Sequence, residues 1–351
     1  MAASSYDALL VLSFGGPEKP DDVLPFLENV LRGRNVPHER MLEVAEHYYH
    51  FGGKSPINDQ NRALIEALER ELRQNGPRLP VYWGNRNWHP YLSDTLRKMQ
   101  TDGIRRALVF VTSVFSSYSG CRQYLEDIAK SRAEIGEGAP QLHKLRSFYN
   151  HPSFIEAEAD RVRKALDEIP ADRRPTSKIL FTAHSIPNAM ADSSEYQQQL
   201  NEACRLVAEN SNLPAWRLVF QSRSGPPGQP WLEPDVGDVL REMEPGQDVL
   251  LIPIGFISDH MEVLYDLDTE ARAICQERRL NMIRAETVGI HPQFIAMIRE
   301  LISERLGLCQ PRAIGNYPPS HDTCPADCCP PPARRPSSAH SDSSPRTIAQ
   351  R

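Results

Sequence analysis

Short apolar runs rich in β-branched and aromatic residues alternate along the chain with longer stretches of helical period. Helical stretches such as 61–72 and 154–162 separate the runs. This alternation predicts the α/β class, with parallel sheets flanked by helices and joined by right-handed crossovers. The runs that predict buried strands are 9–14, 80–83, 107–112, 178–182, 217–221 and 248–254.

The distribution of these runs predicts two similar lobes. Three runs precede residue 115 and three follow residue 177, although the sequence shows no clear internal repeat. A chain of 351 residues is also longer than one core usually needs. We therefore expect one lobe over 1–150 and a second over 151–308, then a cysteine-bearing segment over 309–329. Residues 330–351, rich in Pro, Ser and Arg, are expected to be disordered.

Composition and charge exclude several functional classes. Hydrophobic residues make up 40% and charged residues 25%, as in globular proteins. The formal charge of -6 gives no overall field that would attract nucleic acid or an anionic membrane. No apolar run approaches the roughly 18 residues of a membrane helix, and the N-terminus lacks the basic region of a signal peptide. We expect a cytoplasmic protein with no integral membrane segment and with reduced thiols.

Two groups of residues could carry chemistry. His184 directly follows a predicted strand, where a neutral imidazole accepts a proton near pH 7; the alternative is a hydrogen-bonded loop histidine. The second group is the acidic segment 259–270. If a helix begins near Asp259, that residue is an N-cap and Glu262 occupies the capping-box position. Alternatively, Glu262, Asp266 and Glu270 form a row of carboxylates that a divalent metal would use.

Three ordered motifs resemble the ferrochelatase family. They are Thr-Ala-His-Ser-Ile-Pro at 182–187, Gln-Ser-Arg-Ser-Gly-Pro at 221–226 with Pro-Trp-Leu-Glu-Pro at 230–234, and Gly-Phe-Ile-Ser-Asp-His-Met-Glu-Val-Leu-Tyr-Asp-Leu-Asp at 255–268. Shorter matches lie at 12–17, 51–58 and 82–86, so the resemblance runs from about residue 6 to 308. It implies two Rossmann-like lobes around a porphyrin cleft, and insertion of ferrous iron, a substrate, with release of two pyrrole protons.

The resemblance also implies roles for individual residues. His184 would lie beside the pyrrole nitrogens as proton acceptor or metal ligand, with Glu262 as its partner across the cleft. His260, Asp266 and Asp268 would line the metal or proton path. Which porphyrin face loses the protons stays open. Some bacterial relatives have Tyr where Phe14 stands, and Phe has no oxygen to offer iron.

Candidate porphyrin contacts follow from the same motifs and from charge. Guanidinium groups pair bidentately with carboxylates, as porphyrin propionates require, but each arginine could equally form a surface or interdomain salt bridge. The candidates are Phe14, Arg86, Ser113, Tyr118, Arg122, Arg223 and Trp231.

The cysteines suggest an additional metal site. Cys204 and Cys275 lie in helical patterns and are expected to be buried, whereas three others lie in the proline-rich tail. Family members with a two-iron two-sulfur cluster hold it with one body cysteine and three near the C-terminus. The matching residues are Cys121, Cys324, Cys328 and Cys329. Cys309 is an alternative, because an adjacent cysteine pair is tight, and zinc is an alternative occupant.

The substrate is the least determined feature. The tail and the Phe-Gly-Gly-Pro loop at 14–17 look like the actinobacterial branch, which favours coproporphyrin III; protoporphyrin IX remains an alternative. A cobalt chelatase of the same fold and a non-catalytic tetrapyrrole or metal carrier are the rival functions. We expect a monomer.

Overall fold

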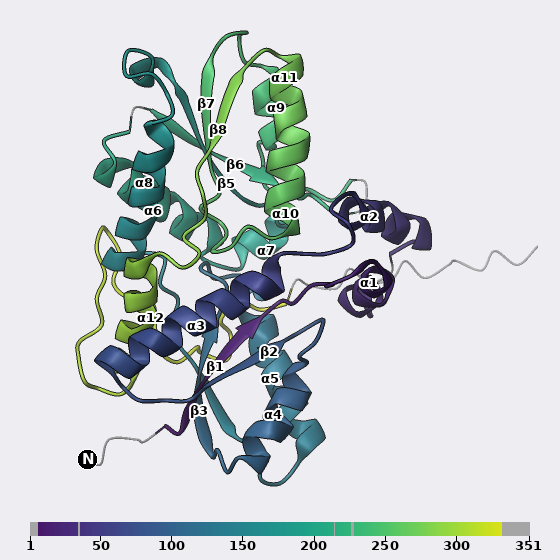
Figure 1. The fold of residues 1–351 in the computed structure, drawn as a ribbon, viewed down its shortest axis with the longest axis vertical. Helices are drawn as coiled ribbons and strands as arrows, with labels where there is room; N and C mark the ends of the chain where they lie inside the picture. Colours follow the sequence, from purple (N-terminus) through teal and green to yellow (C-terminus); the bar gives the residue numbers. More distant parts are fainter. Residues whose placement is uncertain (1–5, 34–35, 214, 226–227, 332–351) are drawn as a thin grey trace, which may run out of the picture.

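Two four-stranded parallel sheets form the two halves of the molecule (Figure 1). The computed structural model describes residues 6–33, 36–213, 215–225 and 228–331. The first sheet has the order β2-β1-β3-β4 and the second the order β6-β5-β7-β8. The predicted α/β class with two helix-flanked lobes is confirmed. The strands are β1 (Ala8–Ser13), β2 (Val81–Asn85), β3 (Arg106–Val111), β4 (Gln141–Lys144), β5 (Lys178–His184), β6 (Trp216–Gln221), β7 (Asp248–Ile252) and β8 (Asn281–Arg284).

The six predicted strands correspond to β1 to β3 and β5 to β7, and two strands were missed. β4 and β8 lie at equivalent edges of the two sheets and pair on one side only. Their sequences, Gln-Leu-His-Lys and Asn-Met-Ile-Arg, are short and at least half polar. Central strands such as β1 and β7 are instead buried along their whole length and give the continuous apolar runs typical of parallel sheets.

A layer of long helices joins the two lobes. α12, the last helix, packs on α6 and on α3, which belongs to the first lobe (Figure 1). One continuous apolar core includes Phe110 of β3, Phe181 of β5 and Phe294 of α12. The apolar core is therefore continuous between the two lobes. The helices of this layer are α3 (Ile57–Asn75), α6 (Pro152–Leu166), α8 (Tyr196–Asn210) and α12 (Pro292–Arg305).

Of the remaining helices, α4 packs on β2, α9 on β6 and α11 on β8. α1 and α2 form a small cluster of their own around Phe26 and Trp88. Two segments, η2 and η4, are π-helical. The bounds are η1 (Pro20–Asp22), α1 (Val23–Leu31), α2 (His38–His50), α4 (Leu92–Thr101), η2 (Tyr118–Arg122), α5 (Gln123–Ile135), η3 (Arg174–Thr176), α7 (Asn188–Asp192), α9 (Val236–Arg241), α10 (Met261–Val263), η4 (Leu264–Ala271) and α11 (Arg272–Glu277).

The two lobes share a local signature that the sequence pattern did not reveal as a repeat. Each fourth strand is followed by a His-Pro pair that starts a long helix, as His-Pro-Ser-Phe-Ile at 151–155 and His-Pro-Gln-Phe-Ile at 291–295. The His151 side chain accepts a hydrogen bond from the Ser153 amide at 3.2 Å, and His291 does the same for the Gln293 amide, also at 3.2 Å. The equivalent caps and strand orders relate the two halves structurally.

The C-terminal segment runs across both lobes as far as residue 331. The Asn150 side chain donates to the Tyr317 carbonyl oxygen at 3.0 Å, and Glu202 of α8 accepts from the Asn316 amide at 2.6 Å. Polar contacts to the body therefore hold this proline-rich segment. Most of the tail expected to be disordered, 332–351, lies outside the described residues. Among the described helices, none has the length and apolar character needed to cross a bilayer.

Candidate active site and cysteine site

His184 is the last residue of β5, and its backbone and ring are both held in place. Its Nδ1 hydrogen-bonds the Ser185 carbonyl oxygen, and the Tyr196 hydroxyl donates to the His184 carbonyl oxygen at 2.9 Å. Because a carbonyl oxygen only accepts, Nδ1 carries a proton, which leaves Nε2 as the nitrogen that can exchange one. Nε2 lies 3.6 Å from Glu262 Oε1. The sequence motifs thus meet as a His–Glu pair.

The loop after β7 brings Glu262 to His184. This loop crosses the end of β5 at Gly255, whose amide donates to the Thr182 carbonyl oxygen at 3.1 Å. A Cβ at position 255 would lie 2.7 Å from Ala183 Cα, closer than real side chains approach. Glycine therefore lets the loop lie directly on the strand. The chain then enters α10, where Glu262 faces His184.

Opposite charges dominate the electrostatics of the pair. Burial lowers the pKa of His184, but the Glu262 carboxylate, helped by the Ser185 carbonyl oxygen and the Asp266 carboxylate, raises that pKa to about 9. Burial alone would raise the pKa of Glu262, yet the His184 cation lowers it to about 2. Exposed fractions of 31% for the His184 side chain and 47% for Glu262 keep the pair in contact with solvent. At neutral pH the pair is an imidazolium and a carboxylate, so His184 is not the neutral group expected from its ordinary pKa.

Asp266 supplies a second titratable group beside the pair. The Ser222 hydroxyl donates to Asp266 Oδ2, and Gln221 Nε2 donates both to the same oxygen, at 3.3 Å, and to the Glu262 carbonyl oxygen, at 2.8 Å. Burial raises the pKa of Asp266 to about 7, and the nearby Glu262 carboxylate adds to this. Asp266 therefore changes charge near neutral pH, and a proton can occupy it there.

The helical geometry of this segment differs from the predicted α-helix. α10 ends at Val263, and the π-helix η4 follows from Leu264 to Ala271. A π-helix has i→i+5 hydrogen bonds and a wider turn, so residues four apart come near one face. Glu270, whose pKa burial raises, continues the acidic row after Asp266. The row of carboxylates therefore begins on α10 with Glu262 and continues on the π-helix with Asp266 and Glu270.

The sequence predicted a cap at the start of this segment but named the wrong N-cap residue. His260, not Asp259, is the N-cap of α10: its Nδ1 accepts from the Glu262 amide at 3.2 Å. Asp259 instead pairs with Arg284 at 2.9 Å, and Asp268 binds Arg284 Nε at 2.8 Å. Because β8 was not predicted, this arginine partner could not be foreseen. The ion pair engages the Asp268 carboxylate, which limits its use on a metal path.

The four predicted cluster cysteines lie together. Cys121 is buried in the π-helical turn η2, with Cys324 and Cys329 beside it. These neighbours, and then the Lys144 ammonium, lower the pKa of the Cys121 thiol. Cys328 Sγ lies 3.7 Å from Cys329 Sγ. Four thiols from two distant segments fit the ligation of an iron-sulfur cluster.

The adjacent pair Cys328 and Cys329 is accommodated by a left-handed backbone. Cys329 has φ of 50°, a conformation rare outside glycine, and its thiol reaches Cys121. Cys328 Sγ instead lies 3.6 Å from His321 Nε2. Cys309 is exposed at the end of α12, with its Sγ 3.9 Å from the Glu300 carbonyl oxygen. Cys204 of α8 and Cys275 of α11 are both buried in the second lobe, and their burial was predicted.

Comparison with known proteins decides the family. The ferrochelatase family model matches residues 6–306. The chain belongs to the ferrochelatase family. It is 59% identical to a ferrochelatase of Rhodopirellula baltica, with 94% of this chain and 95% of that one covered. It is 51% identical to the coproporphyrin III ferrochelatase of Streptomyces coelicolor (97% and 98% covered) and 50% identical to that of Nocardia farcinica (95% and 99%).

Solved structures of chelatases share the fold. The sirohydrochlorin chelatase SirB of Bacillus subtilis subspecies spizizenii, in complex with cobalt, superimposes with a TM-score of 0.52 at 10% identity. The match covers 86% of this chain and 96% of that one. At this identity the likeness concerns the two-lobed architecture alone, and the ferrochelatase assignment rests on the sequence relatives.

Of the arginines considered for a ferrochelatase substrate, two are engaged elsewhere. Arg86 pairs with Asp127, lies 4.4 Å above the Tyr124 ring and is 7% exposed, so the salt-bridge alternative describes it. Arg122 Nη2 donates to the Ala326 carbonyl oxygen at 2.5 Å and holds the cysteine tail. Arg223 is 48% exposed and bonds the Gln229 carbonyl oxygen at 3.2 Å. Arg223 is the most exposed of the three side chains, and its guanidinium also lies 3.9 Å from the Glu233 carboxylate.

The remaining predicted porphyrin contacts divide between two places. Ser113 lines a small cavity with Cys121, and Tyr118 begins the π-helical turn that holds Cys121, with its hydroxyl donating to Glu126 at 3.0 Å. Phe14 follows β1 with 36% of its surface exposed. Trp231 covers Gly225, where a Cβ would lie 2.2 Å from the indole Nε1. That indole N–H has no hydrogen-bond partner within the described residues.

The sequence did not single out three aromatic residues of the site, which are His47, Tyr48 and Tyr196. The His47 ring of α2 stacks on Tyr265 of η4, with ring centroids 3.7 Å apart and planes 9° apart. Burial, and then the Glu262 carboxylate, raise the pKa of both Tyr48 and Tyr196. α2 of the first lobe therefore packs beside the acidic segment of the second. The run His-Tyr-Tyr-His at 47–50 was the available signal.

Proposed function

We propose that this chain inserts ferrous iron into coproporphyrin III and releases two pyrrole protons, as a step of haem synthesis. The His184–Glu262 pair, 3.6 Å apart, carries the proposal, because it joins two family motifs at one exchangeable nitrogen. Relatives at about half identity along nearly the whole chain are named coproporphyrin III ferrochelatases. This supports coproporphyrin III over protoporphyrin IX.

The reaction exchanges two protons for one divalent cation, and the site offers groups for both. His184 Nε2 must lose its proton before it can accept one from a pyrrole nitrogen, and the half-exposed Glu262 connects it to solvent. Asp266, with a pKa of about 7, can hold a second proton. The carboxylates of Glu262 and Asp266 attract the incoming Fe²⁺, a hard cation that accepts oxygen ligands. We place His260, which lies beside Glu262, on the same path of the metal or the protons.

Anaerobic turnover with Fe²⁺ tests the activity and its substrate. The full chain is assayed with coproporphyrin III and with protoporphyrin IX, and we expect higher kcat/KM with the former. The His184→Ala variant should bind porphyrin and lose insertion, because the acceptor is gone while the rest of the site remains. Faster turnover of protoporphyrin IX would reverse the substrate assignment. Porphyrin binding without turnover by the unaltered chain would favour a carrier.

We also propose that Cys121, Cys324, Cys328 and Cys329 hold a two-iron two-sulfur cluster. The cluster would need four thiolates, and Lys144 beside Cys121 favours the charged form. When bound, the cluster would add covalent cross-links between the tail and η2. We also propose that the protein acts in the cytoplasm and as a monomer. Both proposals rest on the sequence alone.

Serine substitutions test the cluster ligands. Each of the four cysteines changed to Ser should bleach the iron-sulfur absorbance of anaerobically purified protein. Cys204→Ser and Cys275→Ser are matched controls and should leave it unchanged. Bleaching by Cys309→Ser, with none by Cys328→Ser, would show a different fourth ligand. Zinc without sulfide in the purified protein would contradict the cluster.

A further inference from the structure

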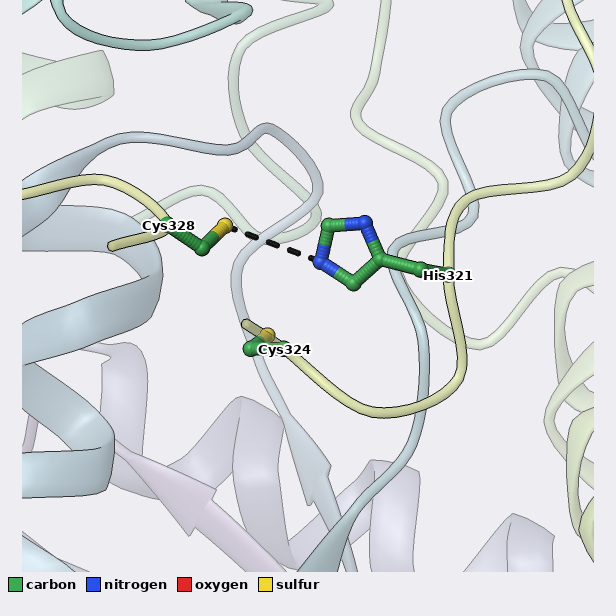
Figure 2. A group of neighbouring side chains, drawn as sticks. All are labelled: His321, Cys324 and Cys328. Atoms are coloured by element: carbon green, nitrogen blue, oxygen red, sulfur yellow. Dashed lines mark hydrogen bonds between the residues drawn. The ribbon is translucent and has the colours of Figure 1, made fainter. Parts of the chain in front are cut away.

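Five metal-ligating side chains meet at the cysteine site, four from the tail and Cys121 from the body. A four-thiolate cluster uses only four of them. The ligand atoms of His321, Cys324 and Cys328 all lie within 4.8 Å of one another (Figure 2). Cys329 adjoins this group through Cys328, and Cys121 contacts Cys324 and Cys329 from the body. A cluster held by four cysteines would leave the His321 imidazole without a role.

Two separations at Cys328 match those between ligands of a single tetrahedral ion. With Zn–S bonds of about 2.3 Å and Zn–N bonds of about 2.0–2.1 Å, tetrahedral angles place two sulfurs about 3.8 Å apart and sulfur and nitrogen about 3.6 Å apart. The Cys328–Cys329 Sγ distance is 3.7 Å, and Cys328 Sγ lies 3.6 Å from His321 Nε2. Figure 2 shows the imidazole edge turned toward the Cys328 sulfur.

The body of the protein holds this segment from both ends. Arg305 of α12 ion-pairs with the Asp322 carboxylate and donates to its carbonyl oxygen at 3.0 Å. Arg122 binds the Ala326 carbonyl oxygen, and the Cys328 amide donates to the Pro325 carbonyl oxygen at 3.1 Å. These contacts position the ligands without any contribution from a metal, which reduces the ordering cost of binding.

We propose that the cluster-free chain binds one divalent ion of the zinc type, tetrahedrally, through the preassembled His321, Cys324 and Cys328, with Cys329 turning in from its position beside Cys328 as the fourth ligand and without Cys121. Each ligating thiol releases its proton to solvent, and the imidazole binds in its neutral form. The ion and the cluster share three cysteines, so only one of them occupies the site at a time. The ion would keep the tail segment ordered when no cluster is present. This site goes beyond the proposed function.

Cobalt(II) titration tests the site, since tetrahedral thiolate coordination of Co²⁺ gives intense visible d–d bands. Full-length Cys121→Ser, which the cluster proposal predicts to be cluster-free, should bind one Co²⁺ per chain with such a spectrum, and Zn²⁺ should displace it. Adding His321→Ala should weaken Co²⁺ binding at least tenfold and shift the bands. Adding His38→Ala, an exposed histidine of α2, is the matched control and should change neither.

The two occupants are distinguished by opposite responses. His321→Ala alone should keep the iron-sulfur absorbance, whereas Cys121→Ser should lose it and keep the Co²⁺ site. Octahedral or absent Co²⁺ binding, or affinity unchanged by His321→Ala, would overturn the ion site. Bleaching of the cluster by His321→Ala would also overturn it, because His321 would then be a cluster ligand. Should Cys121→Ser not fold, Cys121→Ala and wild-type protein stripped of metal anaerobically provide the same comparison. Co²⁺ binding through His321 in a chain that never assembles a cluster would refute only the cluster.

Discussion

One carboxylate sets the charge of the residue that must accept protons. His184 would have an ordinary pKa of 6.5, yet Glu262 raises it to about 9 against the effect of burial. A general base that is protonated at the start has to lose its proton before each turnover. In the free protein, therefore, the reaction should become faster as pH rises toward the pKa of His184.

We predict that Glu262→Gln moves this pH dependence. The amide keeps the shape but loses the charge, so the pKa of His184 falls and the acid limb of kcat/KM shifts from about pH 9 to lower pH. The maximal rate should drop about 10²-fold, because Glu262 no longer accepts or relays a proton. NMR titration of His184 and a pH–rate profile measure both effects. An unchanged limb, or a large fall in melting temperature, would show that Glu262 is mainly structural.

At the scale of elements, the site depends on how a loop crosses a strand and on how a helix is wound. The loop after β7 lies on β5 at Gly255, and the π-helix η4 brings Asp266 back toward Glu262. Both features determine the direction of carboxylates, and neither adds a catalytic group. A change in the crossing should therefore act on the His184–Glu262 contact rather than on either residue alone.

We predict that Gly255→Ala separates the pair. The new methyl group would lie 2.7 Å from Ala183 Cα, so the loop must move and carry Glu262 away from His184. Such overpacking costs about 1–3 kcal/mol of unfolding free energy. Turnover should fall at least tenfold, and the pKa of His184 should drop toward its ordinary value, which a merely destabilised protein would not show. Retention of the raised pKa in the folded variant would contradict the crossing argument.

At the scale of the whole molecule, a buried ion pair connects the first lobe, the last helix and the tail. Arg146, just after β4, binds Glu304 of α12 at 2.7 Å, and its guanidinium also donates to the Arg312 carbonyl oxygen at 2.8 Å. His151 lies beside the pair. Burial, and then Arg146, lower the pKa of His151 to about 3, so it stays neutral. The buried Arg146–Glu304 pair thus holds the start of the tail, at Arg312, before the chain continues to the cysteine site.

We predict that Arg146→Ala destabilises the protein by about 3–5 kcal/mol, because it leaves the Glu304 carboxylate buried without its partner. The tail should also become more accessible to protease between residues 309 and 331. Urea unfolding and limited proteolysis measure these effects. Arg146→Ala combined with Glu304→Ala is the control, and it should recover part of the loss. A loss below 1 kcal/mol in the single variant would show that the pair contributes little.

The sequence by itself determined the strands with continuous apolar runs, the two-lobed α/β class and the residues of the His184 and Glu262 motifs. These features are local: a buried central strand and a strand-end motif are both visible in a few consecutive residues. The cysteines of the tail could be matched to Cys121 only through the family resemblance. The tertiary structure then placed them together.

Tertiary structure alone decided the edge strands, the partners of charged residues and the protonation of the site. β4 and β8 are strands because a neighbour pairs with them, while their own sequences are at least half polar. Arg86 and Asp268 looked available until Asp127 and Arg284 were seen to bind them. The pKa of His184 depends on a carboxylate 78 positions away in the chain and 3.6 Å away in space. Charges interact through space, so the sequence could name these groups but not their pairing.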